Sequence, residues 1–241
     1  MQKRIKEIIR GNKVLLQCMN CVSYFIRKHS FVSSQKYWCN RYKKKGNSGC
    51  GSYGPVAEFK ARIMNDFIVK NNVHSVIEFG CGDGNQLSLL KIPKYIGLDI
   101  SPDALNCCKL RFKKDPEKSF FLYGSEYFLE NRHDFFADAA FSIDVVYHLT
   151  ETAVFDQYLV DLFSSADKWV LIYAADTCKN HRFQSPHVKH RKFTEYIKQK
   201  FPQWKCVEVI KAAIPLKEDP INGSDADFFV YKKDNTKNED K

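Results

Sequence analysis

The feature that most constrains this chain of 241 residues is a short apolar run that leads directly into three closely spaced glycines. Residues 76–84 read VIEFGCGDG. The apolar run predicts a buried strand, and the glycines predict a sharp turn, because glycine adopts positive φ angles without steric cost. Such a turn leaves bare main chain at the end of a strand. We therefore expect a ligand to sit against the backbone there.

Beyond this turn the chain alternates between short apolar runs and helical patterns. This alternation is typical of a largely parallel sheet covered by helices, and so predicts an α/β fold. Ser101 and Thr150 are predicted to cap helices at their N-termini. The predicted strands are residues 74–79, 94–99, 119–123, 139–147, 169–174, 206–210 and 227–231. The predicted helices are residues 56–71, 102–112 and 150–164, with a further helix after residue 193.

Residues 1–34 form a separate N-terminal segment with basic flanks and apolar residues at helical spacing. Its apolar run, residues 14–26, is interrupted by Gln17, Asn20 and Ser23 and falls short of the roughly 20 residues that span a bilayer. We therefore predict an amphipathic helical arm rather than a signal or membrane segment. The arm is expected to pack on the body or on a partner, with peripheral contact to an anionic membrane surface as the alternative.

The formal net charge of +10 raises the possibility of a nucleic-acid partner, because basic surfaces attract phosphates. However, the lysines are scattered among acidic residues from Lys60 onward, and the densest basic groups are residues 43–45 and 187–192. This distribution favours a solvated surface with one patch for an anionic substrate over a nucleic-acid groove. Residues 234–241 are predicted to form a disordered tail.

The nine cysteines have an odd count and irregular spacing, which argues against a disulfide framework and favours a cytoplasmic protein. Cys18 and Cys21 resemble half of a zinc site. No second pair of ligands completes that site in the sequence, so no metal is predicted.

A second predicted strand ends in Asp99, at the distance from the glycines that is typical of an acid that binds ribose. Its carboxylate can accept hydrogen bonds from both ribose hydroxyls. Glu78 and Asp83 lie beside the glycines and would repel the pyrophosphate of a dinucleotide. They suit a ligand that carries an amino group and a sulfonium instead.

Three segments resemble motifs I, II and IV of class I S-adenosylmethionine-dependent methyltransferases: VIEFGCGDGNQL, YIGLDISP and AFSIDVVYHLTE. The resemblance covers roughly residues 35–231 and implies a methyltransferase domain over residues 35–233. It also implies a Rossmann-like, doubly wound and mostly parallel seven-stranded sheet with helices on both faces and an antiparallel last strand. Tyr37, Trp38 and the glycine-rich residues 46–54 further resemble a bacterial methyltransferase subfamily whose substrate is unassigned.

This resemblance implies S-adenosylmethionine as the cofactor and assigns its contacts by position. Glu78 and the glycines would hold the methionine part, Asp99 the ribose, and Ile100 would flank the adenine. Ser125 takes the place where such enzymes usually carry an acidic partner of the adenine amino group. The complete cofactor-binding set is predicted to be Glu78, Gly80, Cys81, Gly82, Gly84, Gln86, Asp99, Ile100, Ser125 and Ser142.

The fourth predicted strand brings Asp144 and His148 to the carboxyl edge of the sheet, where open α/β folds bind ligands. His148 is the candidate general base, because its ordinary pKa is near neutrality. A capping or packing role is the alternative. Asp144 is expected to orient the acceptor or take its proton. Since methyl transfer depends mainly on alignment, a base at this position favours oxygen over nitrogen as the acceptor.

Other residues are predicted to bind the acceptor. The basic segment 187–193 would recognise a phosphate or carboxylate, with a solvated helix start as the alternative. Residues 46–54 are predicted to form a lid over the cofactor, with a flexible linker as the alternative. The predicted substrate-binding set is Tyr53, Tyr147, His187, His190 and Arg191.

The sequence therefore predicts a methyltransferase that methylates oxygen on a small or medium anionic acceptor, such as a sugar, a glycan precursor or another metabolite. Two alternatives remain open at this point. The first is a methyltransferase that acts on RNA or protein. The second is a methyltransferase-like fold that binds without catalysis.

Overall fold

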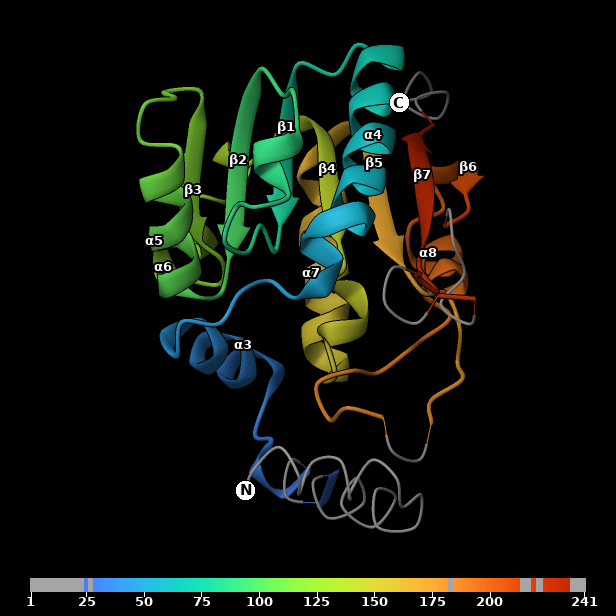
Figure 1. Cartoon of the computed structure of the whole chain (residues 1–241). Coiled ribbons are helices and arrows are strands. Elements are labelled where there is room, and N and C mark those ends of the chain that lie inside the picture. The colour runs from blue at the N-terminus through green and yellow to red at the C-terminus, as the bar shows by residue number, and fades with distance from the viewer. Residues whose placement is uncertain (1–23, 26–27, 182–183, 213–217, 220–222, 235–241) are drawn as a thin grey trace.

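The computed structural model describes residues 24–25, 28–181, 184–212, 218–219 and 223–234. Most of the predicted arm, Cys18 and Cys21 included, and residues 235–241 of the predicted tail lie outside this range. The described part contains a seven-stranded sheet in the order β3-β2-β1-β4-β5-β7-β6 (Figure 1). Its strands are β1 (Ser75–Phe79), β2 (Lys94–Asp99), β3 (Lys118–Leu122), β4 (Ala137–Ile143), β5 (Ala166–Ala174), β6 (Trp204–Ile210) and β7 (Asp227–Lys233).

The sheet is parallel except for β7, which runs antiparallel to both of its neighbours. The predicted Rossmann-like fold is therefore confirmed, including the antiparallel last strand. From β1 the chain builds outward to β2 and β3, and it then returns to β4 on the other side of β1. Strand order thus reverses between β1 and β4, and such a reversal opens a crevice at the carboxyl ends of the strands.

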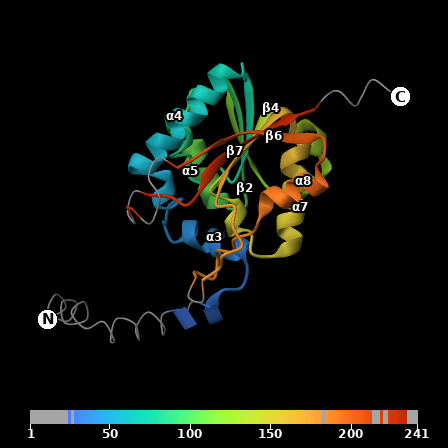
Figure 2. The same ribbon diagram turned by 90° about the vertical axis from the view of Figure 1, so that its right-hand side faces the viewer.

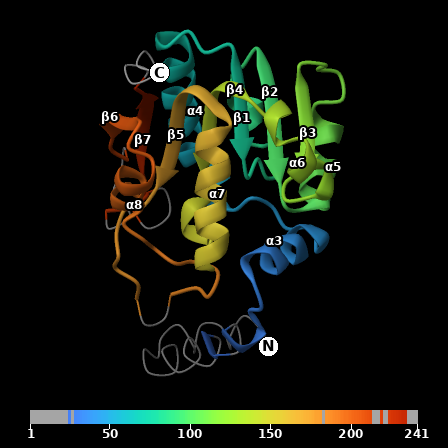
Figure 3. The same cartoon turned by 180° about the vertical axis from the view of Figure 1, so that it is seen from behind.

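Helices cover both faces of the sheet, as Figures 1 and 3 show from opposite sides. On one face, α4 (Gly54–Lys70) and α5 (Pro102–Arg111) bury residues such as Met64 and Leu105 against the sheet. On the other face, α6 (Glu126–Glu130), α7 (Thr152–Ser164) and α8 (Phe193–Lys200) form a second apolar layer. Figure 2 shows α7 and α8 together on the side of the sheet away from α4. Both layers exclude water from the strands, which explains why the strands read as nearly continuous apolar runs.

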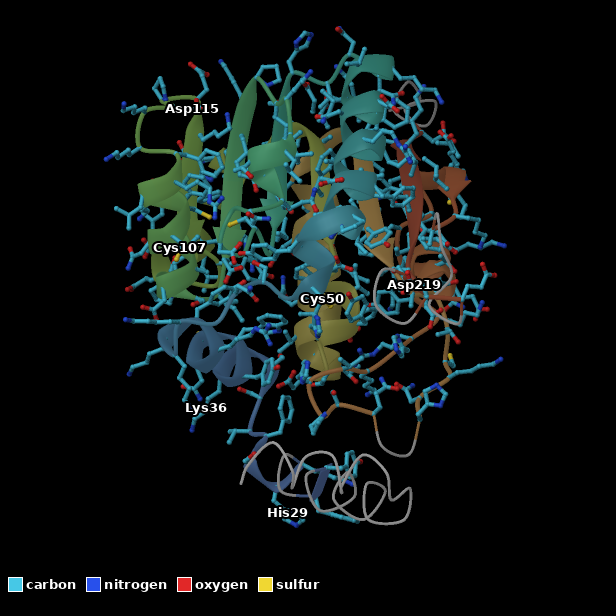
Figure 4. The ribbon with its side chains drawn as sticks, viewed as in Figure 1. His29, Lys36, Cys50, Cys107, Asp115 and Asp219 are labelled. Carbon is cyan, nitrogen blue, oxygen red and sulfur yellow. The ribbon has the colours of Figure 1, made fainter. Side chains whose placement is uncertain are left out.

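The helix α3 (Ser34–Lys43) lies beyond the carboxyl ends of the strands (Figure 1). The side chain of Ser33 caps it by accepting a hydrogen bond from Lys36 N at 3.1 Å. Lys36 is exposed on the outer side of this helix (Figure 4). A short turn of 3₁₀ helix, η1 (Cys50–Ser52), connects α3 to α4. The segment from α3 to η1 therefore lies at the edge of the sheet where the crevice opens.

Two local predictions are wrong. The fourth strand ends at Ile143, because Asp144 adopts a positive φ of 61°, and the 3₁₀ helix η4 (Val146–His148) follows. The N-cap of α7 is Glu151 rather than Thr150, and its side chain makes no capping hydrogen bond. In α4 the buried face is formed by Ala57, Lys60, Ala61, Met64, Phe67 and Ile68, whereas Val56, Phe59 and Ile63 are only partly buried.

Within the described ranges, no helix combines the length and the apolar character that crossing a membrane requires.

Candidate active site

A cavity of about 310 Å³ opens at the carboxyl ends of β1, β2 and β4. This is the point at which strand order reverses, and the volume is typical of a small-molecule site. Residues of α3 and of the loop before α4 close it from the other side, among them Trp38 and Ser48. The sequence-predicted site residues that line the cavity are Glu78, Gly80, Cys81, Gly82, Gln86, Asp99, Ile100, Asp144 and His148.

The glycine turn after β1 is fixed by the carboxylate of Asp99. Gly82 has a φ of 58°, and its N–H donates to Asp99 Oδ2 at 3.0 Å. Ser101 N donates to the other carboxylate oxygen at 2.8 Å. A Cβ at Gly82 would lie 2.3 Å from Ser48 Oγ, so only glycine permits this approach of the two loops. Each oxygen of Asp99 keeps further accepting capacity for a ligand hydroxyl.

Glu78 lies one residue before the end of β1 in a buried position, where it accepts a hydrogen bond from Tyr95 Oη at 2.5 Å. Burial raises the pKa of Glu78 to about 7 and the pKa of Asp99 to about 6. Both carboxyl groups therefore favour the charged form less strongly than they would in water. A cation bound in the cavity would restore their charge.

Glu78 gives a prediction for the stability of the ligand-free protein. Because its pKa is raised in the folded state, its contribution to stability is complete below the ordinary pKa of 4.5 and is lost as pH rises to about 7. We expect Glu78→Gln, which mimics the protonated group, to be more stable than the wild type at pH 8, by up to about 3 kcal/mol. The difference should shrink at pH 5. Thermal unfolding at the two pH values measures it, and a difference that grows toward low pH would contradict the raised pKa.

Asp83 faces the loop before α4 rather than a ligand. Its Oδ2 accepts hydrogen bonds from Ser48 N at 3.0 Å and from Tyr53 Oη at 2.8 Å. Burial would raise the pKa of Asp83, but these hydrogen bonds outweigh burial and lower it. Tyr53 thus fastens the loop to the glycine turn instead of lining the cavity. Figure 4 labels Cys50 in this loop.

His148 lies in η4 and lines the cavity, and its protonation state follows from its contacts. Its Nδ1 is 3.0 Å from the carbonyl oxygen of His187, which can only accept, so Nδ1 carries the proton. The other ring nitrogen, Nε2, therefore holds a lone pair. Burial lowers the pKa of His148 to about 4, so the ring is neutral at physiological pH. Trp38 packs edge-on against this ring with the centroids 4.8 Å apart.

The other predicted substrate residues do not line the cavity. Arg191 donates to the carbonyl oxygens of Leu149 and Thr150 at 2.6 and 2.9 Å. His187 stacks on Tyr37 with the centroids 3.9 Å apart, and His190 packs beside Tyr147. These side chains hold the segment 184–192 against η4 and α3.

Three predicted cofactor residues also lie away from the cavity. A Cβ at Gly84 would meet Phe112 and Cys108, so this glycine serves packing against α5. Ser125 caps α6 by accepting from Phe128 N at 3.2 Å. Ser142 is buried, with its Oγ 2.7 Å from Tyr158 Oη.

Residues 77–161 match a protein family described as "Methyltransferase domain". This segment is a methyltransferase domain. The fold is similar to three solved methyltransferase structures, which are at most 21% identical to this chain. No curated protein is significantly similar to the chain in sequence.

One similar structure is the methyltransferase domain of bacterial CtHen1-C, with 21% identity and a TM-score of 0.57 over 73% of this chain and 97% of that one. A second is the N-methyltransferase NodS of Bradyrhizobium japonicum WM9 with S-adenosylhomocysteine, with 14% identity and a TM-score of 0.58 over 74% and 87%. The third is magnesium protoporphyrin IX methyltransferase ChlM of Synechocystis PCC 6803 with bound S-adenosylmethionine. It has 12% identity and a TM-score of 0.57 over 85% and 99%.

S-adenosylhomocysteine is bound in the NodS structure and S-adenosylmethionine in the ChlM structure, and the cavity residues of this chain fit a ligand of that kind. Asp99, Ile100 and Tyr123 line the cavity. The carboxylate of Asp99 could accept hydrogen bonds from ribose hydroxyls, and Ile100 and Tyr123 could form apolar walls for an adenine ring. The buried Gln86 Oε1 lacks a hydrogen-bond partner among the described residues, and a ligand amino group would satisfy it.

Lys60 and Glu151 are among the residues in or beside the cavity that the sequence did not predict as site residues. Lys60 of α4 is completely buried, and its Nζ lies 2.5 Å from Asp144 Oδ2. Glu151 lines the cavity and accepts hydrogen bonds from Ser34 N and Ser34 Oγ at 2.9 and 2.6 Å, which fastens α3 to α7. The sequence holds a signal for Lys60 alone: it interrupts the stripe of Ala57, Ala61 and Met64 at helical spacing.

Proposed function

We propose that this protein transfers the methyl group of S-adenosylmethionine to an oxygen of a small or medium acceptor, with His148 as the general base. The observation that carries the proposal is the hydrogen bond from His148 Nδ1 to the carbonyl oxygen of His187. It fixes the tautomer in which Nε2 can accept a proton. An oxygen acceptor must lose a proton during transfer, so a neutral imidazole beside the cavity suits it.

The cofactor supplies an electrophilic methyl group on a positively charged sulfur. The residues of the chain bind and orient the cofactor and the acceptor and shield them from water. Asp99 would hold the ribose and Glu78 the amino group, and Trp38 and Ser48 would close the cavity against water. His148 takes the proton of the acceptor hydroxyl at Nε2, while the His187 carbonyl keeps the ring in place.

The structure gives no support to the predicted negative charge of the acceptor. Arg191 is engaged by two backbone carbonyl oxygens, and no lysine or arginine of the described residues lines the cavity. We therefore propose an acceptor whose reacting end is uncharged. The similar structures do not decide the acceptor either, since one is described as an N-methyltransferase and another as a porphyrin methyltransferase.

Calorimetric titration with S-adenosylmethionine and S-adenosylhomocysteine tests the first half of the proposal. A screen of alcohols, phenols, sugars and amines for release of S-adenosylhomocysteine tests the second half. Turnover with hydroxyl compounds supports the proposal. Turnover with amines only would refute oxygen transfer, and tight binding without turnover across the screen would favour a binding module.

His148→Gln is expected to lower kcat/KM for the identified acceptor by about 10²–10⁴-fold, the usual contribution of a general base. Affinity for S-adenosylhomocysteine should stay near the wild-type value. Because the pKa of His148 is about 4, the wild-type rate should also lack a His148 titration between pH 6 and 8. A wild-type rate that rises through pH 6.5 and flattens in the variant would contradict the lowered pKa of His148, but it would still identify His148 as the base. An unchanged kcat/KM in His148→Gln would refute the role of His148.

RNA is the second candidate acceptor, and the observation that favours it is the net charge of +10. Binding of RNA would release counterions, so its affinity would fall steeply with salt. Titration of a labelled RNA oligonucleotide at 50 and 200 mM salt distinguishes an RNA acceptor from a small one. An RNA acceptor predicts binding that weakens steeply with salt, whereas a small acceptor predicts weak binding and no methyl transfer to the RNA.

A further inference from the structure

The lysine at position 60 is placed where lysines seldom occur. Its side chain is 0% exposed, and it belongs to the face of α4 that packs on the sheet. Its Nζ bonds Asp144 Oδ2 at 2.5 Å and lies 5.3 Å from the centroid of the Tyr173 ring. A charge so deeply buried is costly unless it is paired, and here Asp144 is the partner.

Asp144 is held from three sides at the end of β4. Lys60 contacts Oδ2, and Tyr147 Oη donates to Oδ1 at 2.7 Å. The backbone of Gly51 in η1 comes so close that a Cβ there would lie 3.0 Å from Oδ2. The residue adopts a positive φ of 61°, which aspartate tolerates better than most side chains. The carboxylate is therefore fixed in one orientation.

The pair is asymmetric with respect to the cavity. Asp144 lines the cavity and its side chain is 19% exposed, whereas Lys60 is absent from the lining and fully covered. The negative end of the pair thus lies nearer to a bound ligand than the positive end. Of the charged groups that line the cavity, Glu78, Asp99, Asp144 and Glu151 are all acidic.

The cofactor and its product differ by one methyl group and one charge: the sulfur is positive in S-adenosylmethionine and neutral in S-adenosylhomocysteine. We propose that the Lys60–Asp144 pair sets the preference of the cavity for the charged cofactor over the neutral product. Asp144 attracts the sulfonium, and Lys60 limits that attraction so that the product can exchange with the cofactor. This inference rests on the proposed function, because it requires that the cavity binds both compounds.

Several titratable groups surround the pair and must be considered in the test. Tyr147 and His148 of the η4 segment and Tyr173 of β5 face Asp144, and Lys60 also acts on Glu78. The loss of Lys60 would raise the pKa of Glu78 further. Glu78 is assigned to the methionine part, which is common to both compounds. A change in the charge of Glu78 therefore alters the affinities for S-adenosylmethionine and S-adenosylhomocysteine by a similar factor, which largely cancels in their ratio.

The experiment measures the dissociation constants of both compounds by calorimetry at pH 8 and forms their ratio. Lys60→Met leaves an unpaired carboxylate at the cavity and should raise the preference for S-adenosylmethionine by about tenfold. The double variant Lys60→Met/Asp144→Asn removes the pair and should lower the preference by about fivefold relative to the wild type.

Lys70→Met is the matched control. Lys70 lies on the same helix and pairs with Glu208 at 3.2 Å, but both side chains are exposed, so the ratio should not move. If Lys60→Met does not fold, the double variant decides alone. A ratio for the double variant that equals or exceeds the wild-type ratio overturns the inference. If the wild type binds neither compound, the proposed function itself fails, which is a different and separately visible result.

Discussion

Asp99→Ala is expected to weaken binding of both S-adenosylmethionine and S-adenosylhomocysteine by at least about 100-fold. Each hydrogen bond to a charged acceptor contributes roughly 1.5–3 kcal/mol, and two ribose hydroxyls are expected to donate to this carboxylate. The substitution also releases Gly82 N and Ser101 N, which hold the glycine turn in place. Calorimetry with each compound measures the loss.

Asp138→Ala is the control for this prediction. Asp138 lies near the start of β4, at the opposite edge of the sheet, and likewise accepts two backbone hydrogen bonds, from His74 N at 2.8 Å and Ser75 N at 3.0 Å. The free energy of unfolding should fall by a similar amount in both variants, but only Asp99→Ala should lose affinity for S-adenosylmethionine and S-adenosylhomocysteine. Equal loss of binding in both variants would mean that Asp99 acts through the fold rather than through the ribose.

Lys60→Met should lower the free energy of unfolding by about 3–5 kcal/mol, because it leaves the carboxylate of Asp144 without its buried partner. The double variant Lys60→Met/Asp144→Asn should recover most of this loss, since no uncompensated charge remains. Urea unfolding followed by circular dichroism measures both. The exposed pair of Lys70 and Glu208 provides the comparison, and Lys70→Met should cost less than about 1 kcal/mol. A double variant less stable than Lys60→Met would show that the pair stabilises the protein in its own right.

The sheet and the end of the candidate site formed by the glycine turn and Asp99 could be predicted from the sequence, because both depend on local patterns. A buried parallel strand needs a continuous apolar run, and a sharp turn needs glycine, so residues 76–84 determined the start of the site. Asp99 was predictable for the same reason: a residue that ends the next strand of a parallel sheet arrives at the same edge. The seven strands and their alternation with helices then gave the fold.

The part of the candidate site around Asp144 and His148 depends on contacts between residues far apart in the chain, and only the tertiary structure decided it. Lys60 meets Asp144 only because α4 packs beside the end of β4, and Asp144 ends that strand through a φ that no pattern indicates. The carbonyl oxygen of His187 determines which ring nitrogen of His148 carries the proton. Arg191 was predicted to bind an anion, but its guanidinium donates instead to the carbonyl oxygens of Leu149 and Thr150, just before α7. Local patterns determine elements and their order, whereas pairings of charges and hydrogen bonds across elements exist only once the chain has packed.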